Sequence, residues 1–490
     1  MTEINDMSDS VPGPLISTGV QGLDHILKGG IPRHAVVLIQ GAAGAGKTTV
    51  GLQFLMEGAE RGEKGLILSV SQNVHELEII AGSHDIDLSR VTVRTVGLEV
   101  EDREEQYALD TNEADLSELL RDIYRVIEEE APDRLVFDSL LELRLLSPNA
   151  VFYRREILRL KRYLIRRKVC ALILDHMDQS VLDRQIEGVA HGVIQMSSET
   201  PRLGNTHRQI LVKKFRGHAF VEGYHDFKIV KGGLEVFPRV IPRELPPCQI
   251  GPTLGTGDQA FDDMLGGGLE FGSTTLIAGQ SGTGKSTLST LFAVTAARRG
   301  VKTGMFLFEE RPEVYRERSR ALGMDVGQQE KEGNLFFHHF DAAEVSAGEF
   351  SQIVLSRVEA DDLGLVVIDS LSGYLNSLPD KDNVISQIHA LLQFLSRRGT
   401  IGLVTMAQHG LLGEEPRSEI DLSFIADSVV LLRHFQKDDD IRRTIAVMKK
   451  RHSAHQHRIK NLIIGPGRVS IADFSSAFTL TDGPDQRVGD

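Results

Sequence analysis

Short apolar runs alternate with longer segments of helical periodicity along the whole chain, and this pattern predicts an α/β fold. The runs are rich in β-branched residues and have no polar face, which is typical of strands buried on both sides of a parallel sheet. The predicted strands are 35–40, 66–70, 135–137 and 171–174 in the first half, and 274–278, 305–308, 365–368 and 401–405 in the second half. Segments such as 47–61 and 151–168 are predicted helices. We expect a mostly parallel sheet covered by helices on both faces.

The pattern occurs twice, because the chain contains an internal duplication. The stretch STGVQGLDHILKGGIP (17–32) returns as GTGDQAFDDMLGGGLE (255–270) at a constant offset of 238 residues. Five prolines in 236–252 mark the linker between the copies. The predicted organisation is a flexible segment at 1–14, a first domain at 15–244, a second domain at 245–474 and a flexible tail at 475–490.

Composition restricts the class of protein. With 41% hydrophobic and 25% charged residues, the chain has the composition of a folded globular protein. The net charge of −14 argues against a protein that coats nucleic acid through its charge alone. The two cysteines, Cys170 and Cys248, are too few for a disulfide framework, and no apolar stretch is long enough to span a membrane. We therefore expect a cytoplasmic protein without a membrane segment.

Each copy carries a glycine-rich motif of the form G-x-x-x-x-G-K-[ST] between a predicted strand and a predicted helix. In this context the motif is typical of a P-loop, whose backbone N–H groups and lysine bind the phosphates of a nucleotide. ATP is the expected ligand. The residues expected to contact it are Gly41, Ala42, Gly44, Ala45, Gly46, Lys47, Thr48 and Thr49 in the first copy, and Gly279, Ser281, Gly282, Thr283, Gly284, Lys285, Ser286 and Thr287 in the second.

An aspartate ends the third predicted strand of each copy, in LVFDS (Asp138) and VVIDS (Asp369). A P-loop needs such an acid to hold the Mg²⁺ that accompanies ATP, and Thr48 and Ser286 supply the hydroxyl ligands. The alternative is that each aspartate only caps the helix that follows it. Because the arrangement is duplicated, the magnesium interpretation is favoured.

The copies differ after their second strands. The second copy reads FLFEERPE, which places Glu309 and Glu310 where a carboxylate can activate the attacking oxygen, with Lys285 at the phosphates. The first copy has Ser71 and Gln72 at these positions, and neither side chain can hold a proton near neutral pH. We expect the second site to hydrolyse ATP and the first mainly to bind it. A solvated acidic pair at a helix start is the alternative for the glutamates.

Two P-loop domains in tandem, each opened by T-G-x-x-x-x-D-x-x-L-x-G-G, resemble the KaiC family of RecA-like ATPases over about 15–473. The resemblance implies a six-subunit ring with nucleotides between neighbours. It also implies that a K-x-R element near the end of each domain faces the nucleotide of the adjacent subunit. The matching residues are Lys214 and Arg216 in the first copy, and Lys449 and Arg451 in the second. Without the family, these cations would be interpreted as a surface patch.

The family also implies autophosphorylation in the second domain, on a Ser-Thr pair that precedes an apolar strand. In SEIDLSFIADSVVLL, Ser423 matches the serine, whereas Phe424 replaces the threonine. Phosphorylation of one site, Ser423, is therefore the expectation, and an ordinary serine at a strand entry is the alternative. The chain departs from the family again in its first domain, because clock proteins carry the glutamate pair in both domains.

The function predicted from the sequence is a ring-forming ATPase with possible serine kinase activity in its second domain, acting in signalling through a protein partner. Two alternatives remain open: a RecA-like DNA-handling ATPase, and an ATP-gated scaffold without catalysis. The basic helix at 151–168 is the main feature in favour of nucleic acid, and a solvated helix face or a subunit contact is the alternative interpretation. Nucleic acid is not the expected partner, because the chain is acidic and poor in aromatic residues.

Overall fold

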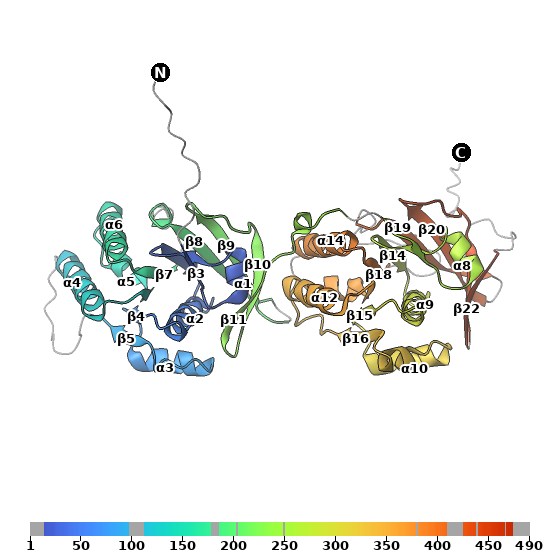
Figure 1. Ribbon diagram of the computed structural model, residues 1–490, viewed down its shortest axis with the longest axis horizontal. Helices are drawn as coiled ribbons and strands as arrows, with labels where there is room; N and C mark the ends of the chain where they lie inside the picture. The colour runs from blue at the N-terminus through green and yellow to red at the C-terminus, as the bar shows by residue number, and fades with distance from the viewer. Residues whose placement is uncertain are drawn as a thin grey trace, which may run out of the picture. The chain divides into compact units, whose positions relative to one another are not determined.

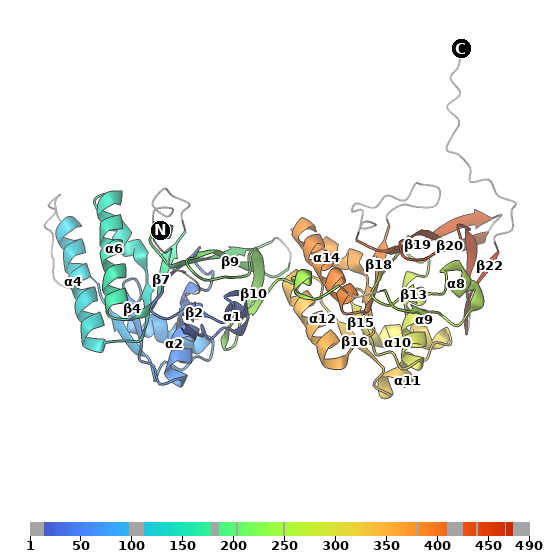
Figure 2. The same ribbon diagram turned by 45° about the horizontal axis from the view of Figure 1, so that its top comes forward.

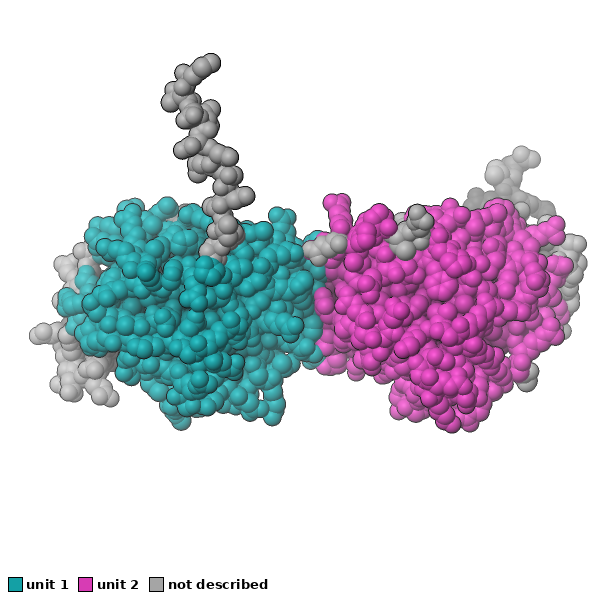
Figure 3. Space-filling model, in the orientation of Figure 1, with its two compact units in different colours: residues 1–239 teal, residues 240–490 magenta. Residues whose placement is uncertain are grey.

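The computed structural model describes residues 14–97, 112–177, 186–201, 204–247, 250–378, 381–408, 425–437, 440–465 and 467–473. The chain divides into two compact units, Met1–Arg239 and Val240–Asp490, which Figure 3 shows in different colours. Each unit is built around one large sheet.

The sheet of unit 1 has nine strands (Figure 1). In spatial order they are β11 (Gly233–Phe237), β10 (Tyr224–Val230), β9 (His207–Phe215), β8 (Gly192–Glu199), β3 (Val36–Gly41), β7 (Cys170–His176), β6 (Arg134–Asp138), β4 (Gly65–Ser69) and β5 (Thr92–Thr95). The strands from β8 to β5 are parallel, and β9, β10 and β11 extend the sheet in antiparallel fashion. A two-stranded ribbon, β1 (Leu15–Ile16) and β2 (Ile31–Pro32), lies outside this sheet.

Helices cover both faces of this sheet (Figures 1 and 2). They are α1 (Gln21–Ile26), α2 (Lys47–Glu60), α3 (Val74–Ser83), α4 (Asn112–Glu130), α5 (Leu140–Leu145) and α6 (Ala150–Arg166). On one face, Val36 and Leu38 of β3 belong to the same buried cluster as residues of α4, α5 and α6. On the other face lies α2, where a side-chain carbon at Gly51 would come within 2.9 Å of Val136 on β6. The P-loop helix and the basic helix therefore lie on opposite faces.

Unit 2 repeats this plan. Its nine strands, in spatial order, are β16 (Leu335–His339), β15 (Thr303–Leu307), β17 (Leu365–Asp369), β18 (Ile401–Ala407), β14 (Thr274–Gly279), β19 (Ser428–Lys437), β20 (Asp440–Lys450), β21 (Lys460–Gly465) and β22 (Arg468–Asp473). The strands from β16 to β19 are parallel, and β20 to β22 are antiparallel. The ribbon of β12 (Thr253–Leu254) and β13 (Leu269–Glu270) matches β1 and β2.

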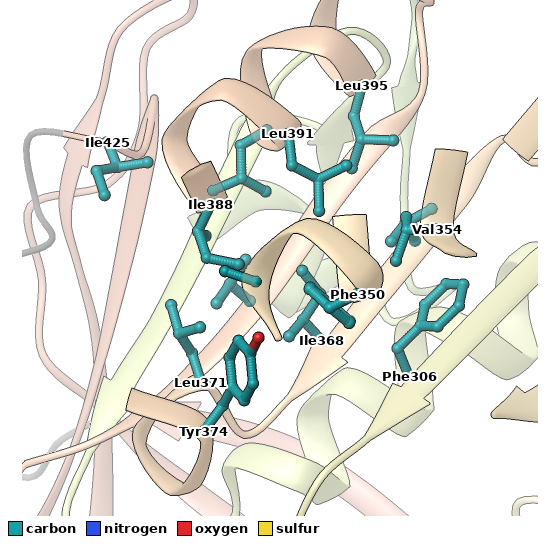
Figure 4. Close-up of a cluster of buried hydrophobic side chains, with 14 of the residues drawn as sticks. Phe306, Phe350, Val354, Ile368, Leu371, Tyr374, Ile388, Leu391, Leu395 and Ile425 are labelled. Carbon is teal, nitrogen blue, oxygen red and sulfur yellow. The ribbon is translucent and has the colours of Figure 1, made fainter. Parts of the chain in front are cut away.

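The helices of unit 2 are α8 (Gln259–Met264), α9 (Lys285–Arg298), α10 (Pro312–Ala321), α11 (Val326–Lys331), α12 (Ala347–Asp361), α13 (Leu371–Ser377) and α14 (Lys381–Arg397), and η1 (Pro242–Glu244) is a 3-10 turn. Between the sheet and the layer of α12, α13 and α14 lies a core rich in aromatic side chains (Figure 4). Within it the rings of Phe308 and Tyr374 stack with centroids 4.4 Å apart. Burial of these large side chains holds the helix after Asp369 against the sheet.

The predicted fold class is confirmed: each half is a mostly parallel sheet with helices on both faces. The predicted strands are all present, and the helix expected at 151–168 is α6. In the part of the chain that the structure describes, no helix is both long and apolar enough to cross a membrane.

His225 on β10 gives unit 1 a predicted sensitivity to acid. Its side chain is fully buried; Nε2 lies 3.1 Å from the Val221 carbonyl oxygen, and Nδ1 accepts a hydrogen bond from the Arg239 N–H at 3.0 Å. Burial lowers the pKa of His225 to about 4. The unfolded chain, with a histidine pKa near 6.5, binds the proton more readily than the folded chain does. Stability is therefore retained above pH 6.5 and lost as the pH falls toward 4.

We expect up to about 1.4 kcal/mol of lost stability per pH unit in this interval from His225. Urea unfolding followed by circular dichroism at several pH values measures the slope, since the chain has no tryptophan to report it. The variant His225→Asn should show a flatter slope. An identical slope in the variant would contradict the assignment.

Candidate functional site

The two P-loops have the same backbone conformation. Each lies between the central strand of its sheet and the following helix, α2 or α9. Gly46 and Gly284 occupy the position before the helix with φ of 90° and 102°, a left-handed conformation that glycine adopts at little cost. In both loops the glycine lets the backbone turn sharply into the following helix. The N-terminal N–H groups of that helix face the loop, which is the arrangement that binds phosphate.

The lysine of each P-loop folds back over its own loop. Nζ of Lys47 donates to the carbonyl oxygens of Gly41 and Ala42 at 2.8 and 2.9 Å. Nζ of Lys285 contacts the carbonyl oxygens of Gly279 and Gln280, both at 2.9 Å. Burial lowers the pKa of both lysines, whereas nearby carboxylates act in the opposite direction. Each loop thus holds one partly desolvated cation where the phosphates of a nucleotide would bind.

The acid and hydroxyl expected at the magnesium position lie together in unit 1. Thr48 Oγ1 donates to Asp138 Oδ2 at 2.8 Å, and the Asp138 side chain is buried at the end of β6. Burial raises the pKa of Asp138, with the Thr48 hydrogen bond and the charge of Lys47 opposing that effect. A carboxylate and a hydroxyl at the phosphate end of a P-loop are hard oxygen donors that suit Mg²⁺.

In unit 2 the corresponding aspartate is held more tightly. Asp369 Oδ1 accepts a 2.5 Å hydrogen bond from Thr405 Oγ1 on β18. Burial raises the pKa of Asp369, and hydrogen bonds from Thr405 and Ser286 oppose the rise. The Ser286 hydroxyl therefore lies beside Asp369, as Thr48 lies beside Asp138. Thr405 was not predicted, because the sequence alone does not indicate which residue of a buried strand faces its neighbour.

Glu309 and Glu310 follow β15, and Glu309 is close enough to the P-loop lysine for its charge to act on that lysine. Glu309 Oε1 accepts a hydrogen bond from Ser370 Oγ at 2.6 Å, at the start of α13. Burial lowers the pKa of Lys285, and the charges of Asp369 and Glu309 oppose that effect. A side-chain carbon at Gly373 would lie 2.7 Å from Glu309 Oε1, so glycine leaves room for this carboxylate.

Glu310 is held by an ion pair with a residue of α10. Its Oε2 pairs with Arg318 on α10 at 2.8 Å, and that guanidinium lies 4.6 Å from the centre of the Tyr315 ring. Burial raises the pKa of Glu310; Arg318 opposes the rise, and the charges of Asp369 and Glu309 add to it. A carboxylate with a raised pKa is better suited to accept a proton than an ordinary one. Arg318 was missed, because no motif distinguishes it from the other arginines of α10.

The corresponding position in unit 1 has no carboxylate. The Gln72 N–H donates to Ser69 Oγ at 3.0 Å, and the buried Oε1 of Gln72 has no hydrogen-bond partner among the described residues. Ser71 precedes it in the turn between β4 and α3. These side chains cannot act as a base, as predicted from their chemistry.

Unit 1 does have a second acid near its P-loop, which the sequence analysis missed. Asp175 is fully buried near the end of β7, and its charge, together with that of Asp138, opposes the lowering of the Lys47 pKa by burial. The next residue, His176, places Nδ1 3.3 Å from the Gly41 carbonyl oxygen. Parallel pairing of β3 with β7 brings both residues to the P-loop. The sequence alone did not indicate these two residues, because β7 is far from the P-loop along the chain.

In each unit the K-x-R element lies toward one end of the strands, and the P-loop lies at the other end. Lys214 pairs with Val193 across β8 and β9, near the beginning of β3, whereas the P-loop follows the end of β3. Lys449 pairs with Val429 in the same way near the beginning of β14. Three residues of strand, roughly 10 Å, separate the level of each lysine from the first residue of the P-loop.

Local contacts hold the same cations in place. Lys214 Nζ donates to the Glu187 carbonyl oxygen, and Arg216 to that of Gly188 at 2.5 Å. Lys449 Nζ donates to the Ala426 carbonyl oxygen at 2.8 Å. Arg451 is exposed and lies 3.3 Å from Asp427 Oδ1.

Two remaining predictions concern Ser423 and the basic helix. Ser423 lies outside the described residues. On α6, Arg155 and Arg159 both pair with the buried Glu156, and Arg167, which follows the helix, pairs with Glu128. Several of its cations are therefore neutralised within the unit itself.

Comparison with known proteins places this site in a family. A family model described as "ATPase: KaiC" matches residues 16–241 and again 254–475. The chain is 27% identical to the circadian clock protein KaiC2 of Synechocystis sp. over 96% of this chain and 83% of that protein. It is 26% identical to KaiC3 of the same organism, over 92% and 90% of the two chains. It is 25% identical to the circadian clock oscillator protein KaiC of Picosynechococcus sp., over 96% and 92%. With both P-loop units matched by the family model, the chain belongs to the KaiC family of ATPases.

Proposed function

We propose that this protein is a ring-forming ATPase whose second domain hydrolyses ATP and whose first domain mainly binds ATP to hold the assembly together. The observation that carries the proposal is the difference between the two domains in the residues that follow β4 and β15. Glu309 lies in the charge environment of Lys285, and Glu310 lies in that of Asp369 and Glu309, whereas Ser71 and Gln72 occupy those positions in the first domain.

In the proposed reaction Glu310 takes a proton from the attacking water while the water oxygen bonds to the γ-phosphorus. The bond from that phosphorus to the bridging oxygen breaks, and ADP leaves. Lys285 binds the phosphate oxygens, and Glu309, fixed by Ser370, helps to orient the water. Ser286 and Asp369 would hold Mg²⁺, which supplies positive charge to the phosphates when it is bound.

The remaining charge is supplied by a neighbouring subunit. Lys449 and Arg451 lie at the strand ends away from their own P-loop, where contacts with Ala426 and Asp427 hold them, and we expect them to act on the nucleotide of another copy. We expect six copies in a ring, with Lys214 and Arg216 acting in the same way at the first site. ATP bound between first domains would stabilise the ring, because a ligand that binds only the assembled form favours that form.

We propose that some of the γ-phosphoryl groups are transferred to Ser423, whose hydroxyl then replaces water as the nucleophile. The phosphorylation state would then be read by a signalling partner. The absence of the neighbouring threonine, replaced by Phe424, limits this cycle to one site.

The test is to incubate the purified chain with Mg-ATP and to measure both free phosphate and the intact mass. We expect steady phosphate release and a mass increment of about 80 Da, the mass added by one phosphoryl group, that is absent in Ser423→Ala. No phosphate release would overturn the ATPase proposal. An increment that persists in Ser423→Ala would assign the acceptor to another residue.

A further inference from the structure

A cluster of three buried polar side chains lies directly behind the P-loop of the first domain. Gln40 on β3 and Asp175 on β7 are paired neighbours with no exposed surface. Their strand positions place them on the sheet face that is covered by α5, because Val36, Leu38 and Ile173 belong to the core on that face. Arg144 of α5 completes the cluster, with its guanidinium 4.0 Å from Asp175 Oδ1.

The second domain is apolar at the same three positions. The register that pairs Gln40 with Asp175 pairs Ala278 with Met406 in unit 2. Counting from Asp138 and Asp369, Arg144 corresponds to Leu375. Ala278, Met406 and Leu375 are all buried in one hydrophobic core. The fold therefore accepts apolar side chains here.

The cluster is costly as a means of stabilising the first domain. A buried ion pair is often no more stabilising than apolar side chains of similar volume. Neither the nitrogen nor the oxygen of the buried Gln40 amide has a hydrogen-bond partner among the described residues. Buried polar residues that the same fold can replace with apolar ones are expected mainly at functional sites.

The position of the cluster indicates which function it serves. Gln40 immediately precedes Gly41, the first residue of the P-loop. Asp175 accepts a 2.9 Å hydrogen bond from the N–H of His176, whose ring faces the Gly41 carbonyl oxygen. Arg144 belongs to the helix that begins directly after Asp138 and Ser139. The ion pair of Arg144 and Asp175 thus joins two of the segments that would surround the phosphates, and strand pairing places Gln40, at the start of the third, beside Asp175.

We propose that Gln40, Asp175 and Arg144 are positioning residues of the first nucleotide site, which fix the P-loop, the end of β7 and the Asp138 helix in the arrangement that binds ATP. Asp175 provides the second carboxylate near Lys47, as Glu309 does near Lys285. The buried ion pair of Arg144 and Asp175 favours one arrangement of α5 and the end of β7, because separating the two groups would leave each charge uncompensated in the core. This inference rests on the proposed role of the first domain as an ATP-binding site.

The experiment measures binding of radiolabelled ATP with Mg²⁺ to the full chain by equilibrium dialysis. Every variant carries Lys285→Ala, so that the signal reports the first site. The triple change Gln40→Ala, Asp175→Met and Arg144→Leu copies the second domain. Arg144→Leu and Arg144→Lys form a second pair, which differs in the charge beside Asp175. The matched control is Glu156→Gln, which removes another buried carboxylate with arginine partners from α6 of the same unit.

We expect the triple change and Arg144→Leu to raise the Kd for ATP at least about tenfold, the effect of losing one charged contact. Arg144→Lys should stay within about threefold, because it retains the charge but not the fork geometry. Glu156→Gln should lower the melting temperature without changing the Kd. A triple variant that is folded by circular dichroism and binds within about twofold of its parent would overturn the inference. So would equal Kd values for Arg144→Leu and Arg144→Lys. If the Lys285→Ala parent itself binds no ATP, the proposed role of the first domain fails, and the inference fails with it.

Discussion

Replacing both Glu309 and Glu310 with glutamine is expected to lower steady-state phosphate release about 10²- to 10⁴-fold, the range for loss of general-base catalysis. The amide of glutamine retains the size and much of the hydrogen bonding of the carboxylate but cannot take a proton. Since Lys285 and the P-loop backbone are unchanged, the affinity of the second site for ATP should change little. A phosphate-release assay beside ATP-binding measurements separates the two effects.

Glu313→Gln is the matched control for that experiment. Glu313 lies in the first turn of α10, its side chain is 76% exposed, and its contact with Arg316 spans 3.6 Å. Its replacement should leave phosphate release unchanged. If the double variant also released phosphate at the parent rate, the second domain would have to use another base, and the proposed division of labour would be wrong.

The second large effect is expected from Arg451→Ala, which should lower kcat about 10³-fold, at the lower end of the range for a cation supplied in trans. Because Arg451 lies away from the P-loop of its own unit, we also expect activity to return when two different inactive variants are mixed. Subunits with Arg451→Ala keep their carboxylates, and subunits with Glu310→Gln keep their arginine. Mixed rings of the two inactive variants should therefore regain activity at interfaces where an intact acid meets an intact arginine.

The mixing experiment has a direct control in Arg458→Ala. Arg458 is exposed and, like Arg451, lies in the connection between β20 and β21. Its variant should be active alone. Failure of the mixture to exceed the sum of the two separate variants would show that Arg451 does not act across a subunit interface.

The sequence was sufficient for the fold because its determinants are local and occur twice. Short apolar runs such as 135–137 and 365–368 recur between helical segments in both halves, which is typical of strands buried on both faces, and each P-loop motif is flanked directly by a strand and a helix. The antiparallel extension of each sheet was not predicted. Strands such as β9 and β20 alternate in burial and carry charges, so their apolar signal is weak.

The candidate sites were predicted only as far as they are contiguous in the sequence. The P-loops and the aspartates of 138 and 369 belong to motifs, so spacing alone identified them. Asp175 and Thr405 come from strands distant in sequence, and the pairing of β7 and the register of β18 bring them to the site. Arg318 is close to Glu310 in sequence, but no motif distinguishes it from the other arginines of α10. Such long-range register is set by tertiary packing, which no single window of sequence contains.

The two halves obtain the second acid near the P-loop lysine from different strands, β7 in the first and the end of β15 in the second. This difference constrains how the protein can evolve after its ancestral duplication. Introducing glutamates at 71 and 72 would place four carboxylates around Lys47, because Asp138 and Asp175 are already there, so Asp175 would have to be lost first. Loss of Asp175 alone would weaken the very site that the new acids were to serve. A return of the first half to the arrangement of the second half is therefore expected to need coordinated substitutions at 71, 72 and Asp175.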